Sequence, residues 1–283
     1  MALLASSPGL WVGAVFIFAL MLGSFLNVVI HRLPKMLEAQ WHDQCVELKG
    51  ESPAPRPAYN LLVPSSTCPA CGHAIAPWHN LPLLGWLWLK GRCHHCAARI
   101  SVRYPLVELL TAALAATVAW RFGFGWQALA GIVLVCALVA LAFIDLDTSL
   151  LPDPITQPLL WLGLLVNLDG LFTPLADALA GAVAGYLLLW SVYWAFKLIT
   201  GKEGMGYGDF KLLAALGAWL GWQQLPLVIL ASSLVGALAG LALILFTRHD
   251  RRIPIPFGPY LAGGGVLALL AGPRLLQLWL HSA

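Results

Sequence analysis

A series of long apolar stretches, separated by short polar ones, limits what this chain can fold into. A helix of about 20 apolar residues covers a hydrocarbon core of roughly 30 Å. Only 10% of the residues are charged and the mean hydropathy is +0.80, whereas soluble domains carry about 25% charged residues. The sequence therefore predicts an all-α polytopic membrane protein with about eight transmembrane helices. The expected spans lie near 9–30, 105–121, 126–144, 155–171, 176–198, 210–222, 226–247 and 257–280.

The basic residues predict the orientation, because Lys and Arg are retained on the cytoplasmic side of a membrane. Placing residues 31–104 inside leaves only Arg121 and Arg274 of the 16 basic residues outside. The first apolar run has no basic segment before it and no cleavage site after it, so we expect it to stay as a helix. Three parts follow: a first transmembrane helix (1–30), a cytoplasmic loop (31–104) and a seven-helix membrane core (105–283).

Four of the six cysteines form two Cys-x2-Cys pairs in that loop: Cys68, Cys71, Cys93 and Cys96. Such pairs place four thiolates around a Zn²⁺ ion at about 2.3 Å, as in zinc ribbons. Disulfides or a redox pair are the alternatives, and a reducing cytoplasm disfavours persistent disulfides. We expect a small zinc-ribbon-like domain with a structural metal, because four protein ligands leave no position for a catalytic water. With the cysteine set complete, His73, His94 and His95 are expected at the surface.

Two aspartates stand next to apolar spans, where an ionisable side chain is costly and therefore indicates function. Asp145 ends the third span in AFIDLDTSLLPD, and Asp209 begins the sixth in GMGYGDFK. Both fall on the cytoplasmic side of the predicted topology, so they could form an aspartyl dyad. A dyad shares one proton between its carboxylates, activates water and polarises the scissile carbonyl. The glycines beside Asp209, at 204, 206 and 208, would let a substrate backbone approach closely.

Helix capping is the alternative explanation for these carboxylates, and spacing alone favours it. Asp209 could satisfy free N–H groups at the start of the sixth span. Asp145, Asp147 and Asp153 could likewise be solvated loop residues, with Asp153 starting the fourth span.

The motifs around the aspartates resemble those of a known protease family. GMGYGDFK, with its G-x-G-D core at Gly206 to Asp209, is similar to the signature of GxGD aspartyl proteases. IDLDTSLLPD (144–153) resembles the partner motif of type 4 prepilin peptidases, and GSFLNVVIHRLP (23–34) resembles their N-terminal motif. The cysteine pairs and RYPLVELL (103–110) complete the family's order, so the resemblance covers almost the whole chain.

The resemblance implies a multi-pass aspartic endopeptidase of the bacterial inner membrane, with its active site at the cytoplasmic face. The catalytic pair that carries over is Asp145 and Asp209, with Asp147 a weaker candidate for the first position. The supporting motif residues are Gly206, Gly208 and Lys211. The implied substrates are type IV prepilins and type II secretion pseudopilins, which would lose their basic leader peptides. Membrane lipid is the other expected partner, and nucleic acid is not expected.

Family members with the cysteine module are expected also to methylate the new N-terminus with S-adenosylmethionine, so the resemblance implies a bifunctional enzyme. No Rossmann-like glycine fingerprint marks a site for this donor. Gly91, shortly before Cys93, is a weak candidate, and a turn glycine inside the zinc ribbon is the stronger interpretation.

Two polar features stay open at this point. Glu108, inside the second span, either pairs with Arg103 or Lys211 or lies at the headgroup level. The PIPFGPYL segment (254–261) has three prolines, which interrupt helices. It is either an unwound segment near the dyad or a stop before the last span.

Two other classes of function compete with the peptidase. A transporter would show two related halves and helices broken near the midplane, and no such repeat is visible. A non-catalytic pilus or secretion assembly factor would explain the cysteines but would leave GYGD to chance. The sequence favours the peptidase.

Overall fold

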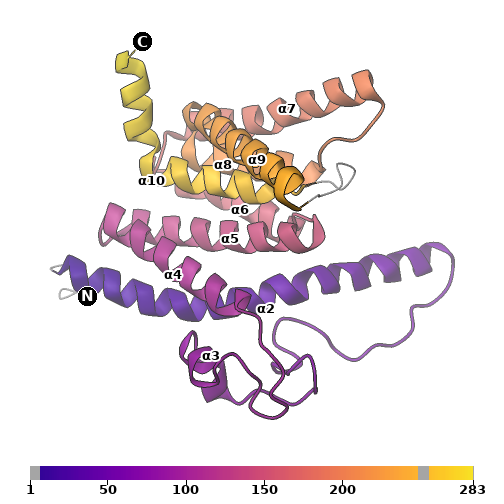
Figure 1. Ribbon diagram of the computed structural model, residues 1–283. Helices are drawn as coiled ribbons and strands as arrows, with labels where there is room; N and C mark the ends of the chain where they lie inside the picture. Colours follow the sequence, from indigo (N-terminus) through magenta and orange to yellow (C-terminus); the bar gives the residue numbers. More distant parts are fainter. Residues whose placement is uncertain (1–6, 248–254, 283) are drawn as a thin grey trace. The chain divides into compact units, whose positions relative to one another are not determined.

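A computed structural model describes residues 7–247 and 255–282 of the chain (Figure 1). Within these residues the regular elements are helices, and β-pairing is limited to two isolated bridges. This confirms the all-α prediction. The chain divides into two compact units, Met1–Phe124 and Gly125–Ala283.

The first unit is built on two long helices, α2 (Pro8–Leu48) and α4 (Arg103–Phe122), which pack along each other. Their backbones meet at Gly23, where an added Cβ would lie 2.7 Å from the Cα atom of Glu108. One turn further on, the side-chain amide of Asn27 donates to the carbonyl of Tyr104 at 3.1 Å. A small residue and an interhelical hydrogen bond are common means of joining helices in membranes.

Helix α2 is much longer than the apolar run that begins it. The apolar run was expected to span residues 9–30, yet the helix continues without a break through Pro34 to Leu48. At 1.5 Å per residue its 41 residues extend about 60 Å, roughly twice the thickness of a hydrocarbon core. Near its end, Arg56 of the following loop contacts Asp43 at 3.0 Å and His42 at 3.1 Å.

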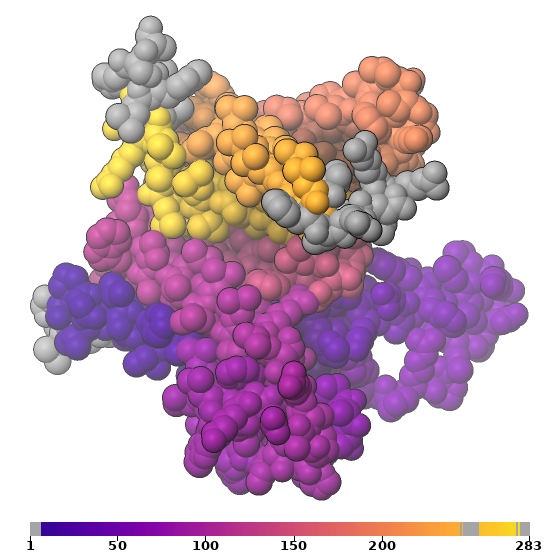
Figure 2. All heavy atoms as spheres, in the orientation of Figure 1, coloured from indigo at the N-terminus to yellow at the C-terminus, as the bar shows by residue number. Residues whose placement is uncertain are grey.

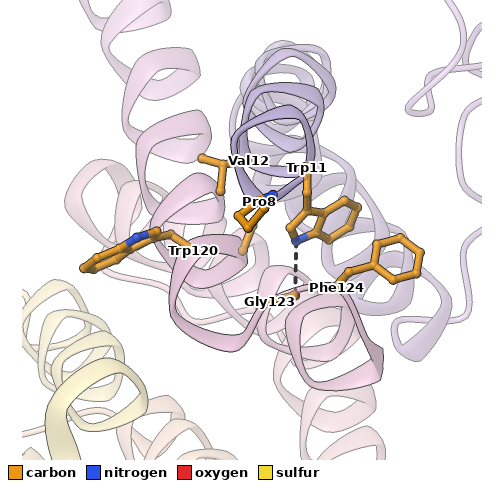
Figure 3. A pocket seen from close by; sticks show the side chains of 7 residues that line it. Pro8, Trp11, Val12, Trp120, Gly123 and Phe124 are labelled. Carbon is orange, nitrogen blue, oxygen red and sulfur yellow. Dashed lines mark hydrogen bonds between the residues drawn. The ribbon is translucent and has the colours of Figure 1, made fainter. Parts of the chain in front are cut away.

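A shallow apolar pocket of about 130 Å³ lies where the first turns of α2 meet the last turn of α4 (Figure 3). The indole of Trp11 donates to the carbonyl of Gly123 at 3.1 Å and packs edge-on against Phe124. Trp120, also at the pocket, is exposed. An apolar hollow bordered by tryptophans is typical of a membrane–water interface.

The second unit contains six helices and one 3₁₀ turn, η2 (Trp222–Gln224), in the part that the structure describes. The helices are α5 (Trp126–Thr148), α6 (Asp153–Val166), α7 (Leu175–Thr200), α8 (Tyr207–Leu220), α9 (Leu225–Thr247) and α10 (Gly258–Ser282). α8 is the central helix: it packs against α6 and α7 and also contacts α9 and α10. Its side chains from Asp209 to Leu220 are buried, apart from a half-buried Lys211. In Figure 2, α9 and α10 lie side by side on the visible face of this unit.

Glycines let the neighbours of α8 approach its backbone. A Cβ added at Gly217 would collide with the carbonyl of Gly181 on α7, and one added at Gly181 would collide with the carbonyl of Gly217. One turn away on α7, a Cβ at Gly185 would lie 2.7 Å from the carbonyl of Leu213. Contacts this close are possible only without side chains, so the α7–α8 pair depends on its small residues.

A buried amide closes the end of α8. The side-chain nitrogen of Asn167 donates to the carbonyls of Ala218 and Trp219 at 2.9 and 3.0 Å. Its oxygen accepts the backbone N–H groups of Phe172 and Thr173. The last carbonyls of a helix have no partner inside the helix. Asn167 satisfies two of them without water.

Five helices within the described residues are long and apolar enough to cross a membrane. They are α2, α4, α5, α7 and the stretch Trp222–Leu243 that contains most of α9. α6 and α8 have only 14 residues each, which gives about 21 Å of helix. Every expected span is helical, but those two helices are shorter than a full crossing. The sixth span begins at Tyr207 rather than 210, and the fourth ends at Val166 rather than 171.

The glycine contact gives a test of the fold. We expect Gly217→Ala to lower the midpoint of unfolding in detergent, because overpacking of this kind costs about 1–3 kcal/mol. The matched control is Gly263→Ala in α10, where an added Cβ has nothing within 4 Å. This control should be neutral or stabilising, since Ala is favoured over Gly in a helix by about 1 kcal/mol. Equal effects of the two substitutions would show that the Gly181–Gly217 contact is not needed.

Candidate active site and metal site

Asp145 lies in the last turn of α5 and its side chain is only 5% exposed. The helix ends just beyond it at Ser149, which has a left-handed backbone (φ 52°) and donates its N–H to the carbonyl of Asp145. One carboxylate oxygen of Asp145, Oδ2, accepts the backbone N–H of Gly258 at 2.9 Å. Gly258 is the first residue of α10, so this N–H has no partner inside its own helix.

Asp209 lies in the first turn of α8 and is 7% exposed. The N-cap residue of that helix is Gly206, and Asp209 turns one carboxylate oxygen back toward the N–H of Gly206, as an acidic residue at the third position of a helix does in a capping box. The other oxygen, Oδ1, is buried without a hydrogen-bond partner. Capping therefore explains the position of one oxygen of this carboxylate. The other oxygen is buried without a hydrogen-bond partner, and capping does not explain it.

The two carboxylates belong to one site. Asp145 is close enough to act electrostatically on Asp209. The buried Leu151 lies between the segments next to the two aspartates: its Cβ would lie 2.7 Å from a Cβ added at Gly208, and its Cδ2 would lie 3.0 Å from one added at Gly258. Gly208 and Gly258 both need to be glycine at this contact, since a side chain at either would displace Leu151.

The other residues of the two aspartate motifs lie around this pair. Asp147 is exposed near the end of α5. Lys211, two residues after Asp209, bonds both carboxylate oxygens of Asp153 at 2.6 and 2.8 Å and so joins the starts of α8 and α6. Gly206 has only the Asp209 carboxylate and the Gly208 backbone near it, at 3.8 Å or more.

Gly258 is the residue of this site that sequence reasoning missed. The segment 254–261 was expected either to unwind near the dyad or to stop a helix; residue 254 lies outside the described residues. From Ile255 to Phe257 the chain is not helical, and α10 begins at Gly258. The sequence signal was the pair of prolines around Phe257-Gly258, which fixes where the helix starts. Which carboxylate its N–H would reach could not be read from the sequence.

Glu108 takes a partner that was not expected. Its Oε2 atom accepts the backbone N–H of Leu83 at 2.8 Å, and the side chain is 8% exposed. Lys211, one of the two expected partners, bonds Asp153 instead. Glu108 thus ties the loop of the cysteine module to α4.

The four cysteines form one cluster in which all Sγ atoms lie within 4.8 Å of one another. Each pair sits in a turn of the same design. The N–H of Cys68 donates to the carbonyl of His73, and the N–H of Cys93 donates to that of Ala98. One short antiparallel bridge closes each turn, Thr67 with Ala74 and Arg92 with Arg99. Four thiols at this spacing fit a tetrahedral metal site.

The turns also favour thiolates, which are the form that binds metal. Backbone N–H groups of Cys71 and Ala70 point at the Cys68 sulfur and lower the pKa of its thiol to about 6. The equivalent N–H groups of Cys96 and His95 lower the pKa of the Cys93 thiol. The donor set therefore fits a divalent metal with four sulfur ligands.

The remaining predictions for the module concern its histidines and a glycine. His73, His94 and His95 are exposed, as expected. Gly91 has a positive φ of 67°, and a Cβ added there would lie 2.8 Å from the ring of Trp86. Its position is that of a turn glycine packed against an indole.

Comparison with known proteins gives two family matches that divide the chain. Residues 17–122 match the bacterial peptidase A24 N-terminal domain, and residues 132–241 match the type IV leader peptidase family. No solved structure gives a significant match.

Curated relatives match along nearly the whole length. A protein of Aeromonas salmonicida (strain A449) is 60% identical over 278 residues, covering 97% of this chain and 96% of its own. One of Aeromonas hydrophila is 60% identical over 275 residues, covering 96% of this chain and 95% of its own. One of Pseudomonas aeruginosa is 56% identical over 281 residues, covering 99% and 97%. Each is named prepilin leader peptidase/N-methyltransferase. The chain therefore belongs to the type IV leader peptidase family.

Proposed function

We propose that this protein is a membrane aspartic endopeptidase that removes basic leader peptides from type IV prepilins and then N-methylates the new N-terminal residue. The names of its full-length relatives support both activities. The observation that carries the peptidase is the burial of Asp145 and Asp209 in one site, with one oxygen of Asp209 left without a partner. No comparable observation favours a transporter or a non-catalytic assembly factor.

The dyad would work through a single shared proton. Two carboxylates this close cannot both ionise easily in an apolar site, so one stays protonated. The ionised carboxylate takes a proton from water as the water attacks the scissile carbonyl. The protonated carboxylate donates a hydrogen bond to the carbonyl oxygen, where negative charge develops. The proton taken from water can then pass to the leaving amine.

Two helix N-termini assist this chemistry. Asp209 lies in the first turn of α8, and the first N–H of α10 reaches Asp145. Helix N-termini carry partial positive charge, which stabilises nearby carboxylates. This offsets part of the cost of holding negative charge in the membrane protein. Gly206, which has nothing closer than 3.8 Å to an added Cβ, leaves the backbone beside Asp209 open for a substrate strand, whereas Gly208 packs against Leu151.

We place the site at the cytoplasmic face of a bacterial inner membrane. The support is the distribution of Lys and Arg, which puts the cysteine module and both aspartates on one side. A basic leader would stay among the anionic headgroups there, and the apolar helix of the substrate would remain in the bilayer. Type II secretion pseudopilins fit the same description and are proposed as substrates. Lipid is the surrounding partner, and no role for nucleic acid is proposed.

The metal of the cysteine cluster is proposed to be structural Zn²⁺. All four ligands come from the protein, so no position is left for a reacting water. S-adenosylmethionine would supply the methyl group, as the methyltransferase part of the relatives' names implies. No side chain is assigned to this donor. The Trp86 ring beside Gly91 favours the turn role for that glycine over a binding role.

The dyad predicts that Asp145→Asn and Asp209→Asn each reduce prepilin cleavage by at least about a thousandfold, because residues that act as a unit fail together. The control is Asp147→Asn, the exposed aspartate of the same motif, which should cleave within a few-fold of the unchanged protein. Purified proteins would be incubated with a prepilin and a labelled methyl donor, and cleavage and methylation read separately. Methylation of an already cleaved pilin should survive all three changes. Appreciable cleavage by either dyad variant would overturn the assignment.

Gly258→Ala should lower kcat for cleavage about ten- to a hundredfold with little change in KM. Its Cβ would lie 2.6 Å from Oδ2 of Asp145 and must push that carboxylate out of place. Gly263→Ala, one turn further along α10 in open space, is the matched control and should leave kcat unchanged. A normal kcat for Gly258→Ala would mean that the N–H of Gly258 does not position Asp145.

The metal proposal predicts about one zinc per chain, measured by elemental analysis of protein purified without added metal. Single Cys→Ser changes at positions 68, 71, 93 and 96 should each lose the metal and make residues 66–100 sensitive to protease, because metal binding drives the folding of such small modules. Cys45→Ser and Cys136→Ser, which change the two cysteines outside the cluster, are controls that should retain the metal. Native protein that is folded but free of metal would contradict the proposal.

A further inference from the structure

The segment between the two cysteine turns exposes an unusual number of large apolar side chains. Residues 78–88 read WHNLPLLGWLW, and within these 11 residues Trp88 is 75% exposed and Trp78 is 60% exposed. The other exposed members are Leu81, Leu84 and Leu87. Soluble surfaces rarely carry a continuous apolar patch of this kind, and such patches mark contacts with proteins or membranes.

These side chains are exposed because the segment packs on the rest of the cysteine module through one face only. Its 3₁₀ turn η1 (Pro77–Asn80) and short helix α3 (Leu84–Trp88) pack on each other at Gly85, where an added Cβ would collide with the backbone of His79. Trp86 points into the module and donates its indole N–H to the carbonyl of Ile100 at 3.3 Å. One face of the segment thus belongs to the fold of the module, and the other is left uncovered.

The hydrogen bond from the Leu83 N–H to Glu108 fixes where the segment lies along the axis of α4. Glu108 lies five residues after Arg103, so about 7.5 Å from the start of that helix. Side chains on a helix lean toward its N-terminus. The Glu108 carboxylate, which holds the N–H of Leu83 at 2.8 Å, is therefore close to the end of α4 at which the membrane span begins.

Among Asp, Glu, Lys and Arg, only basic residues occur near the segment in the sequence. No acidic residue occurs between Glu51 and Glu108, whereas Lys90, Arg92 and Arg99 are exposed in the module that follows the segment. Basic residues next to an apolar, tryptophan-containing face are the pattern of peptides that lie in the interface of an anionic bilayer. A protein partner with an apolar face would not require this bias in charge.

We propose that residues 78–88 are a membrane anchor that lies in the boundary between headgroups and acyl chains, in the leaflet where α4 begins. Leu81, Leu84 and Leu87 contact acyl chains, and the two exposed tryptophans lie at the level of the headgroups. Lys90 and Arg92 contact anionic lipid. The anchor holds the cysteine module against the membrane surface. Glu108 fixes the depth of the anchor relative to the start of α4.

The test uses the full-length protein labelled with 5-fluorotryptophan in nanodiscs of phosphatidylcholine and phosphatidylglycerol. Trp78→Phe, Trp88→Phe and Trp41→Phe assign three ¹⁹F resonances by their disappearance. Two paramagnetic probes are then compared: a nitroxide on the lipid acyl chain near the headgroup, and a gadolinium chelate in the water. We expect the lipid nitroxide to broaden the resonances of Trp78 and Trp88 at least about threefold more than the chelate does.

Trp41 is the matched control, because it is also exposed but lies on the polar continuation of α2. At residue 41 the helix has risen about 50 Å from its start, well beyond one hydrocarbon core. Its resonance should respond to the chelate and not to the lipid nitroxide. If Trp78 and Trp88 respond as Trp41 does, the segment faces water and the proposal fails. Protection of both from both probes would mean that protein covers the segment, and this would overturn the proposal as well.

A second comparison tests the role of Glu108. Glu108→Gln keeps an oxygen that can accept the N–H of Leu83, and the broadening by lipid should be unchanged. Glu108→Leu removes the acceptor and should reduce the broadening of Trp88 by the lipid nitroxide at least about twofold. If the lipid nitroxide broadens the Trp88 resonance equally in the two variants, Glu108 does not determine the depth of the anchor in the membrane.

Discussion

Two buried carboxylates that interact electrostatically within an apolar bundle are the constraint on which the second unit depends. A charge placed there without support would cost several kcal/mol, so its surroundings have to supply positive potential. The start of α8 and the start of α10 both do so, one by carrying Asp209 and the other by donating the Gly258 N–H to Asp145. Two helices must therefore begin at this site; three glycines (201, 204 and 206) precede α8, and Pro256 closely precedes α10.

The shortness of α8 follows from the same constraint. A helix that begins at a buried aspartate and ends under the Asn167 amide has only 14 residues, and neighbouring helices cover its sides almost completely. Such coverage requires the neighbours to come within backbone contact, which the glycines of α7 and α8 permit. The pair of buried aspartates and the glycine packing are thus two consequences of placing one short helix at the centre of the bundle.

The sequence predicted the helices and the cysteine cluster of this protein better than the hydrogen bonds that join them. Apolar runs indicated eight helices that the structure describes, because a helix buried in lipid or protein is apolar along its length, but α6 and α8 have only 14 residues each and five helices are long enough to cross a membrane. The Cys-x2-Cys pairs indicated the four-cysteine cluster, because its four thiols come from two local turns. The bonds from Gly258 to Asp145 and from Leu83 to Glu108 join residues 113 and 25 positions apart, and no local pattern reports them. The continuation of α2 through Pro34 was also missed, since a proline followed by charged residues normally favours a break.

The continuous course of α2 makes the first unit sensitive to rotation as well as to length. Each residue of a helix turns the next by about 100°, so inserting one residue after Arg32 would swing the far end of α2 by more than a quarter of a circle. Asp43 would then point away from Arg56, and the loop that returns from the helix would leave from a different side. An insertion of seven residues completes nearly two turns and would keep the same face. Related chains that vary in this part of the helix should therefore differ in steps of whole turns.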